Sequence, residues 1–451
     1  MSLKLILPYG ARYIIDNLCS CGFEAYVVGG CVRDALLNKE PHDWDICTAA
    51  HPNTVSGIFR DNVIVPTGIR HGTLSIVSND GKLYEVTTFR VDGAYSDHRR
   101  PDTVSFTPSL EQDLARRDFT INAMAYNDRR GLLDPFGGCS DLGKKLIRCV
   151  GSADERFQED ALRIMRALRF ASVYGFSIEQ ETSAAIHRNK GLLYQIAVER
   201  INAELCRLIC GSGALPVLLD YGDVIAEIVP EFAPCIGFDQ KNRYHVYTIY
   251  EHIMRALDGY KGGDMVTKLA LFFHDIGKPD CYTEDERGGH FHGHGVVSAQ
   301  KTDDIMTRLR FDNETKRLVT ELVLYHDSTI EPTGKVVRRW LNKIGPEQFG
   351  RLLDVREADM RAHAPDTFQS RLERNDSLRA LFGEIVEENA CFSLKNLAIN
   401  GDDVMSFGVP QGKCVGDLLG SALEKVINNE LPNEKEALMS YIKELWMYDK
   451  V

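Results

Sequence analysis

The strongest constraint on the fold lies at residues 23–50, where two short apolar segments flank a Gly-Gly pair and a helical stretch. The apolar segments read EAYVVGG and WDICTA, and VRDALLNK between them has the spacing of a helix. Further along, GTLSIVSNDGKLYEVTTFRV has the composition of a hairpin, with Asp80-Gly81 near its turn. Together these segments predict a small α/β domain with a mixed sheet at residues 1–147.

Two aspartates stand one residue apart at the start of the second apolar segment. If HDWDICT is a strand, Asp43 and Asp45 lie on one face and Trp44 lies on the other. Two close carboxylates repel, so an ionised pair favours a cation, and Mg²⁺ takes carboxylate oxygens while keeping places for substrate phosphates. Glu85 is a third carboxylate that a neighbouring strand could supply. A lone Asp-x-Asp is usually a solvated loop, but its place after a strand, a Gly-Gly pair and a helix favours a magnesium site.

The Gly-Gly pair precedes the predicted helix and offers backbone N–H groups at its start. Gly29 and Gly30 are therefore candidates for a phosphate cradle, and Arg33 adds a cation for phosphate oxygens. Two plainer alternatives exist: the pair is a simple turn, and Arg33 forms a surface ion pair with Asp34.

Length and composition indicate a soluble protein of several folding units. The chain has 451 residues, 44% of them hydrophobic and 26% charged, and no run approaches the ~20 apolar residues that span a bilayer. The start lacks the features of a signal peptide, and the twelve cysteines are scattered, which favours reduced thiols and a cytoplasmic location without membrane contact. The net charge of −12 argues against indiscriminate nucleic-acid binding but leaves room for a local basic groove.

Helical patterns dominate from Asp154 onward. DERFQEDALRIMRALRFASVYG has apolar residues at intervals of three and four and ends at a glycine. We expect the head to be followed by a helical neck at 148–215, a helical body at 216–360 and a helical tail at 361–451.

Several motifs in fixed order carry a family resemblance. GGCVRD…DWD resembles the signature of class II nucleotidyltransferases, the family of bacterial CCA-adding tRNA nucleotidyltransferases and poly(A) polymerases. ARRDFTINAMAY at 115–126, EDALR at 159–163 and ERINAE at 199–204 resemble further motifs of that family. The resemblance implies a template-independent enzyme that adds CCA to tRNA 3′ ends from CTP and ATP, with tRNA as partner and no stable protein partner.

The resemblance also implies roles for individual residues. Asp43 and Asp45 would hold two Mg²⁺ ions with help from Glu85. The triphosphate and ribose would be gripped by Arg116, Arg117, Asp118 and Asn122, while Arg166 and Arg169 would face triphosphate or RNA phosphates. Helix support would come from Glu199, Arg200 and Glu204, and a loop that helps to switch from C to A would contain Asp97 and Arg100.

Base selection can be argued from hydrogen-bond types. On one helix, Asp160 and Arg163 are three residues apart and share a face. Aspartate only accepts and arginine only donates, which suits the amino donor and ring-nitrogen acceptor of cytosine and adenine. Guanine and uracil mismatch both groups, at about 1–3 kcal/mol for each mispaired polar group. The plainer alternative is a charged helix face held by local ion pairs.

A second constellation combines histidines with aspartates. LALFFHDIGKP resembles the HD-superfamily phosphohydrolases, and imidazole with carboxylate suits a divalent transition metal. The four expected ligands are His245, His274, Asp275 and Asp327, and the alternates are His294 and His326. In related CCA-adding enzymes this domain is tied to a phosphohydrolase activity.

Three other functions remain open at this stage. The first is a poly(A) polymerase of the same family. The second is a partial enzyme that adds only CC or only A. The third is an HD phosphohydrolase with an RNA-binding head. The acidic balance argues against the first, and the intact aspartate pair argues against the last.

The tail segment INGDDVMSFGVPQGKCVGDLLG resembles the part of the family that holds the tRNA elbow.

Overall fold

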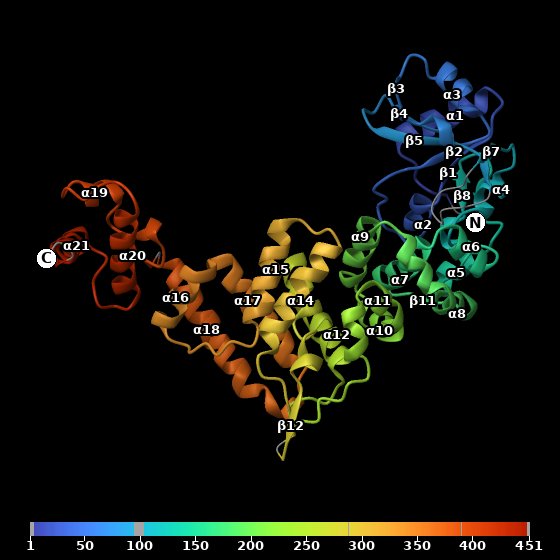
Figure 1. Cartoon of the computed structure of the whole chain (residues 1–451). Helices are drawn as coiled ribbons and strands as arrows, with labels where there is room; N and C mark the ends of the chain where they lie inside the picture. Colours follow the sequence, from blue (N-terminus) through green and yellow to red (C-terminus); the bar gives the residue numbers. More distant parts are fainter. Residues whose placement is uncertain (1–3, 94–102, 287, 389, 449–451) are drawn as a thin grey trace. The chain divides into compact units, whose positions relative to one another are not determined.

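A computed structural model describes residues 4–93, 103–286, 288–388 and 390–448. The chain divides into two compact units, Met1–Pro230 and Glu231–Val451 (Figure 1). The finer division into a head, neck, body and tail stays a prediction.

The first unit contains a mixed seven-stranded sheet, as the sequence predicts. Its strand order is β3-β4-β5-β2-β1-β8-β9, in which β2 and β5 are parallel and the other neighbours are antiparallel. The strands of this sheet are β1 (Ala25–Val28), β2 (Ile46–Thr48), β3 (Val63–Gly68), β4 (Thr73–Val77), β5 (Leu83–Thr88), β8 (Ala125–Asn127) and β9 (Gly131–Leu133). Short pairs are formed by β6 (Arg90–Asp92) with β7 (Val104–Phe106) and by β10 (Leu146–Ile147) with β11 (Ser177–Ile178).

The centre of this sheet carries the core of the unit. All four residues of β1 are buried, and Tyr26 packs in one cluster with Cys47, Phe89 and Leu114. The predicted hairpin is confirmed as β4 and β5, and Gly81 adopts φ 74° at its turn. Strand β2 begins at Ile46, so the expectation that the two aspartates lie within a strand is wrong, because they precede its first paired residue.

Helices precede, connect and follow the strands of the first unit. Its helices are α1 (Tyr9–Ser20), α2 (Gly30–Leu36), α3 (Pro52–Ile58), α4 (Leu110–Ala115), α5 (Gly138–Gly143), α6 (Ala153–Glu159), α7 (Leu162–Tyr174), α8 (Gln180–Asn189), α9 (Val198–Ile209), α10 (Ala214–Asp220) and α11 (Gly222–Ile228). Helix α7 ends at the predicted glycine, Gly175, in the left-handed conformation, and packs against α9.

The second unit is almost entirely helical. Its helices are α12 (Ile249–Gly259), α13 (Met265–Phe273), α14 (His294–Arg308), α15 (Asn313–Tyr325), α16 (Gly334–Ile344), α17 (Pro346–Arg361), α18 (Gln369–Glu387), α19 (Gly401–Met405), α20 (Lys413–Ile427) and α21 (Lys435–Tyr448), with a small hairpin of β12 (Thr283–Asp285) and β13 (Gly288–His290). Helices α12 and α13 pack against α17, and α13 and α14 pack against α15. The last three helices enclose a cluster of their own around Val404, Leu418 and Leu438.

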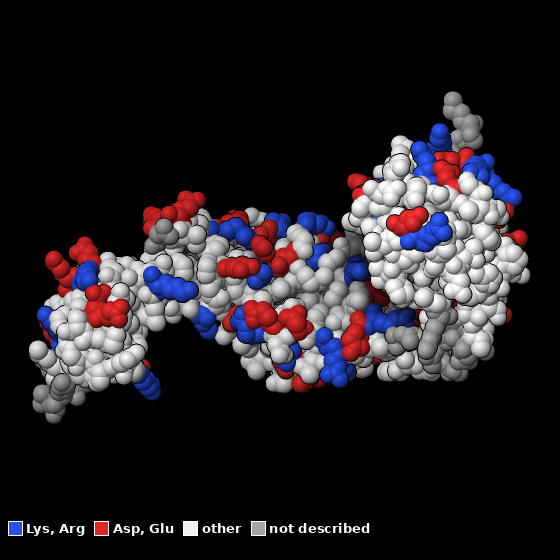
Figure 2. Space-filling model, turned by 90° about the horizontal axis from the view of Figure 1, so that it is seen from above, with Lys and Arg blue, Asp and Glu red and all other residues white. Residues whose placement is uncertain are grey.

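The cysteines and the surface charges are as the composition of the chain leads one to expect. All twelve cysteines are free, as expected. On the face shown in Figure 2, acidic and basic residues lie close together, and neither sign forms a continuous field. Within the described ranges, no helix has the length and apolarity that a membrane crossing requires.

Candidate functional site

A pocket of about 420 Å³ in the first unit collects charged side chains of both signs. It is lined by residues from the start of α2, the segment before β2, the segment after α4, and helices α7 and α9. The charged lining residues are Arg33, Asp34, Asp43, Asp45, Arg117, Asp118, Arg166, Arg169 and Arg207. Carboxylates and guanidinium groups that face one space suit a ligand carrying both metal ions and phosphates.

The aspartate pair meets the third carboxylate through the register of the sheet. Asp43 and Asp45 retain contact with solvent, and Glu85 lies level with Asp45 because β2 and β5 pair in parallel from the next residue of each onward. Desolvation raises the pKa of Asp45; Arg117 opposes that rise, and the charges of Glu85 and Asp43 add to it. The negative charge at this place is therefore not fully compensated, and oxygen donors of this kind fit Mg²⁺.

Gly29 does not offer its N–H to a phosphate, contrary to the expectation from the sequence. Gly29 adopts φ 82°, and its N–H donates to the carbonyl of Met124 at 3.1 Å, so this N–H is not available to a phosphate. A Cβ at this position would lie 2.7 Å from Nη1 of Arg117. Gly29 thus gives the arginine room to lie against the backbone, while Gly30 lines the pocket.

Arg33 is an internal ion-pair partner rather than a free cation. It is buried, its guanidinium donates to Asp34 at 2.9 Å, and its Nη1 donates to Oδ1 of Asn122 at 2.5 Å. Tyr174 also donates to Asp34 at 2.9 Å. The ion pair with Asp34, one of the sequence alternatives, is present, although it is buried rather than on the surface.

Asp118 is the centre of a buried network. Its Oδ2 accepts from Nε and Nη2 of Arg166 at 2.9 and 2.6 Å, and its Oδ1 accepts from Nδ2 of Asn122 at 2.9 Å and from the N–H of Phe119 at 2.8 Å. Burial alone would raise the pKa of Asp118, but Arg166 and Asn122 lower it to about 2. The carboxylate therefore stays ionised and fixes both neighbours in the pocket.

Glu204 on helix α9 contacts two arginines of α7. Glu204 is ion-paired with Arg169 and lies 3.9 Å from Nη1 of Arg166. The guanidinium of Arg169 also stacks 3.9 Å from the ring centroid of Phe170. Glu199, from the same motif, is exposed.

The structure corrects the local geometry expected of Asp160 and Arg163. They do not share a helix, because α6 ends at Glu159, Asp160 adopts an extended conformation and α7 begins at Leu162. Oδ1 of Asp160 accepts from the N–H of Leu162 at 3.1 Å, and Oδ2 accepts from Arg200 at 3.1 Å.

Arg163 is occupied as well. Its Nη1 donates to Glu159 at 2.6 Å and its Nη2 donates to the carbonyl of Arg116 at 3.1 Å. Arg116 itself is ion-paired with Asp113 at 2.8 Å. The local ion pairs that were the plainer alternative are thus present.

The two loop candidates, Asp97 and Arg100, lie outside the described residues.

The second unit has a larger pocket, of about 890 Å³, lined by histidines, aspartates and cations. Two groups of potential metal ligands lie beside it and share Asp275. The first group is His252, His274, Asp275 and Asp359, and the second is Asp275, His294 and His326. Each histidine stands on or at the end of a different helix, from α12 to α15, and the second aspartate comes from α17.

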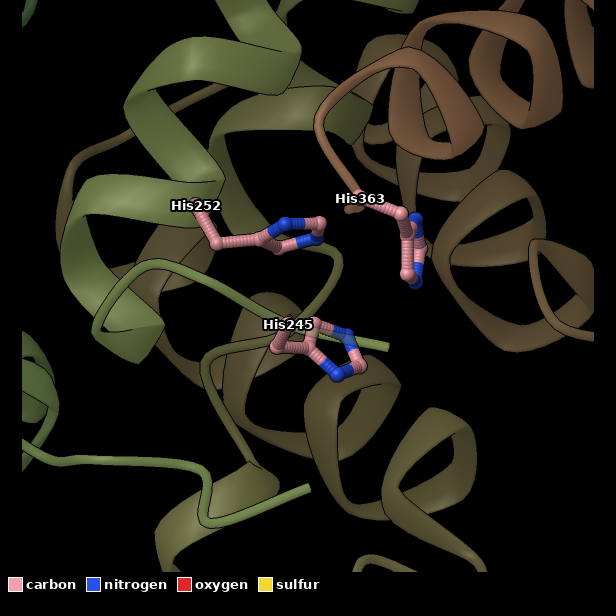
Figure 3. Close-up of side chains that lie close together, drawn as sticks. All are labelled: His245, His252 and His363. Atoms are coloured by element: carbon pink, nitrogen blue, oxygen red, sulfur yellow. The ribbon is translucent and has the colours of Figure 1, made fainter. Parts of the chain in front are cut away.

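This grouping corrects the expected ligand set. His274, Asp275 and both alternates come together, but Asp327 lines the pocket without joining either group. His245 forms a third group with His252 and His363, whose side chains point toward one another in Figure 3. His245 belongs to neither of the two groups that contain Asp275, and its Nε2 lies 3.3 Å from the ammonium of Lys278.

Sequence reasoning missed His252, Asp359 and His363. Asp359 lies in the last turn of α17 and His363 lies two residues beyond its end, so no helical spacing in the sequence pointed to them. Burial lowers the pKa of His245, and the nearby Lys278 lowers it further, so this imidazole is neutral.

The sheet with its carboxylate-and-arginine pocket defines the class of protein: the first unit has a nucleotidyltransferase head. Residues 25–148 match the poly A polymerase head domain, residues 175–235 match the probable RNA and SrmB-binding site of polymerase A, and residues 295–442 match the putative domain 2 of tRNA nucleotidyltransferases.

Whole-chain relatives narrow the class to one family. The chain is 34% identical over 442 residues to a CCA-adding enzyme of Oceanobacillus iheyensis, with 96% of each chain covered. It is 36% identical over 433 residues to that of Latilactobacillus sakei subsp. sakei, covering 95% of this chain and 96% of the relative. The crystal structure of the Bacillus stearothermophilus CCA-adding enzyme in complex with CTP superimposes with a TM-score of 0.73 at 30% identity over 99% of both chains. The chain belongs to the family of CCA-adding enzymes.

Proposed function

We propose that the protein adds C, C and A to the 3′ end of tRNA, with CTP and ATP as substrates and no nucleic-acid template. The observation that carries this proposal is the first pocket, in which solvent-accessible carboxylates face a set of anchored arginines. A nucleoside triphosphate with its metal ions needs both.

The carboxylates of Asp43 and Asp45, with Glu85 beside them, would hold Mg²⁺, which supplies charge neutralisation at the triphosphate and activation of the RNA 3′-hydroxyl. Arg117 and Arg169 line the same pocket and would bind phosphate oxygens. The nucleophile and the leaving group belong to the substrates, so the protein contributes position and charge.

Asn122 is the residue to which this proposal assigns the ribose. Its Oδ1 accepts from Arg33 and its Nδ2 donates to Asp118, so the amide plane is fixed and one N–H remains for a ribose hydroxyl. The buried arginine and aspartate therefore act as positioning residues for the amide.

Asp160 and Arg163 select the base when they exchange their internal partners for it. Arg163 leaves Glu159 and the carbonyl of Arg116, and Asp160 leaves Arg200. The cost of releasing these bonds is offset only by a base that accepts from the arginine and donates to the aspartate, as cytosine and adenine do.

The test uses purified protein, Mg²⁺ and tRNA transcripts that end before CCA, after C and after CC. With labelled CTP or ATP, we expect two C and then one A to be added. A growing ladder of A would identify a poly(A) polymerase, and a stop at CC, or extension of the CC-ended transcript alone, would identify a partial enzyme.

Asp43→Ala tests the placement of the metal ions. We expect incorporation to fall by at least about a thousandfold. The variant lacks one carboxylate ligand, so the cation that neutralises the reacting phosphate would no longer be held. Incorporation that survives this change would refute the assignment of the aspartate pair.

A second activity, hydrolysis of phosphoesters, is favoured by the second pocket. The lining combines four members of the metal-ligand groups, Asp275, Asp359, His294 and His326, with three cations that suit a phosphate, Lys278, Arg243 and Arg371. A divalent transition metal is the expected cofactor there. His274→Ala should abolish hydrolysis of phosphomonoesters or 2′,3′-cyclic phosphates and leave nucleotide addition near normal; loss of nucleotide addition instead would show that the site holds the fold.

A further inference from the structure

One face of the sheet carries exposed apolar side chains at its β3 edge. Residues that pair directly on antiparallel strands share a face, and Leu83 of β5 pairs with Val77 of β4, which pairs with Val63 of β3. Val65 lies two residues from Val63 and therefore on the same face. The exposed fractions of Val63, Leu83 and Val65 are 66%, 57% and 41%. We call these four residues the edge strip.

The exposure of the edge strip is unusual because the core lies on the other face of the same strands. The buried side chains there are Tyr84, Val86 and Thr88 of β5 and Leu74 and Ile76 of β4. The face of an antiparallel sheet that is left to solvent is normally polar. Neighbouring apolar side chains on such a face mark a contact surface, and on an edge strand they would otherwise favour aggregation.

The edge strip is continuous with the carboxylates of the first pocket. Asp45 lies level with Glu85 of β5. Glu85 pairs with Ser75 of β4, which pairs with Val65 of β3. One row of residues therefore crosses the strands from the aspartate pair to the strip. Neighbouring strands lie about 4.8 Å apart, which places Val65 about 14 Å from Asp45, and Leu83 is about 7 Å along β5 from Glu85.

The other residues of the first pocket lie on the opposite side of these carboxylates. In the strand order of the sheet, β1 and β8 lie beyond β2, whereas β5, β4 and β3 lie on its other side. Gly30 follows β1 and Asn122 precedes β8, and both line the pocket. The charged pocket and the apolar strip are thus two different surfaces that meet at the aspartate pair.

The two substrates of nucleotide addition need different surfaces. The nucleoside triphosphate needs cations and metal ions, which the pocket of arginines and carboxylates suits. The RNA brings its 3′-hydroxyl to the same phosphate in line with the leaving group, so its last nucleotides approach the carboxylates from outside the triphosphate pocket. The edge strip has no charged side chain, so it suits bases and riboses rather than phosphates, and open sheet faces bind unstacked RNA bases in other proteins.

We propose that the edge strip binds the last nucleotides of the tRNA before the reacting 3′-hydroxyl, through apolar contacts to their bases and riboses. The inference rests on the nucleotide addition proposed above and assigns a surface of the sheet to the RNA. Apolar contact is non-directional, so the strip accepts different nucleotides as the 3′ end grows.

Photo-crosslinking tests the position of the RNA directly. The full chain is mixed with tRNA transcripts that end before CCA and carry 4-thiouridine as the last nucleotide. The mixture is irradiated without CTP or ATP, and the crosslinked peptides are identified by mass spectrometry. We expect crosslinks on β3 or β5, and crosslinks confined to other segments would overturn the proposal whether or not nucleotides are added. Crosslinks on the strip by a protein that adds no nucleotide would confirm the RNA surface and refute nucleotide addition.

Serine substitutions at the strip give the kinetic test. In the double variant Val63→Ser and Leu83→Ser, the KM for the tRNA transcript should rise about tenfold while the KM for CTP stays unchanged, because only the RNA contacts the strip. Both replaced side chains are exposed, so the fold should be retained. The matched control is Ile6→Ser: this residue is 88% exposed and lies outside the strands of the sheet, so neither KM should change.

An unchanged KM for tRNA in the double variant would overturn the proposal. One form of that result is a parent protein that sediments as a dimer and a double variant that sediments as a monomer with the same KM for tRNA. The edge strip would then be covered by a second copy of the chain rather than by RNA.

Discussion

Replacing Asp118 by asparagine removes one charge from the buried network of the first pocket and keeps the side-chain volume. In the native protein both oxygens accept: one from Arg166 and the other from Asn122 and the N–H of Phe119. An asparagine has one accepting oxygen, so its NH₂ must face either the guanidinium or the other two donors. We therefore expect the substitution to destabilise the first unit.

The magnitude follows from the pKa of Asp118. A fall from 3.8 to about 2 corresponds to about 2 kcal/mol in favour of the ionised folded state. Because the folded pKa is depressed, this stability is fully present above the unfolded pKa and is lost as the pH falls through the folded one. At pH 3 about 1 kcal/mol of it is already lost.

The assay needs a probe confined to the first unit. Of the three tryptophans, only Trp44 lies there, so a background with Trp340→Phe and Trp446→Phe makes its fluorescence specific. Urea unfolding should then give Asp118→Asn a free energy of unfolding lower by about 2–3 kcal/mol at pH 7. The difference from the parent should shrink by about 1 kcal/mol at pH 3.

A surface ion pair in the same unit provides the control. Asp154 pairs with Arg188, and both side chains are close to half exposed, so Asp154→Asn should cost less than about 1 kcal/mol. If Asp118→Asn costs no more than this control, or if its effect does not change with pH, the buried carboxylate does not hold the arginine as argued.

Two further predictions concern the same pocket. Gly29→Ala should raise the KM for CTP and ATP roughly tenfold, because φ 82° costs a residue with a Cβ about 1–2 kcal/mol and the methyl group would displace Arg117. Gly30→Ala, whose Cβ would be in ordinary contact with Arg33, should change KM little, and equal effects of the two changes would contradict this role for Gly29. Arg163→Ala should reduce discrimination against UTP and GTP by about tenfold or more, or abolish incorporation, and unchanged selectivity in single-nucleotide addition assays would remove this residue from base selection.

Local patterns predicted the sheet better than the sites. The hairpin and the strand before Gly29 follow from alternation, β-branched residues and a glycine turn, all of which act over a few residues. The helix expected across Asp160 is interrupted instead, because the aspartate accepts from the N–H of Leu162 and from Arg200 on α9. A side chain that bonds to the backbone two residues on favours a break, and its distant partner is invisible in the local spacing.

The metal-ligand groups show the same limit more sharply. The adjacent His274-Asp275 pair marks a site by itself, whereas His252 and Asp359 are single polar residues on helices whose other buried residues are mostly apolar. Only the packing of α12 and α13 against α17 brings them to the carboxylate of Asp275. Such residues cannot be distinguished from ordinary core histidines or surface acids before the tertiary contacts are known.

The first pocket also explains how a chain with a net charge of −12 can bind polyanions. Two of its arginines, Arg166 and Arg169, are held in ion pairs with Asp118 and Glu204. Each acid costs some of the attraction for phosphate but fixes its arginine, so less side-chain entropy is lost when a ligand binds. Removing the acid should therefore make the pocket more positive and yet less able to position a triphosphate. For this reason we expect Asp118→Asn to lower the rate of nucleotide addition as well as the free energy of unfolding.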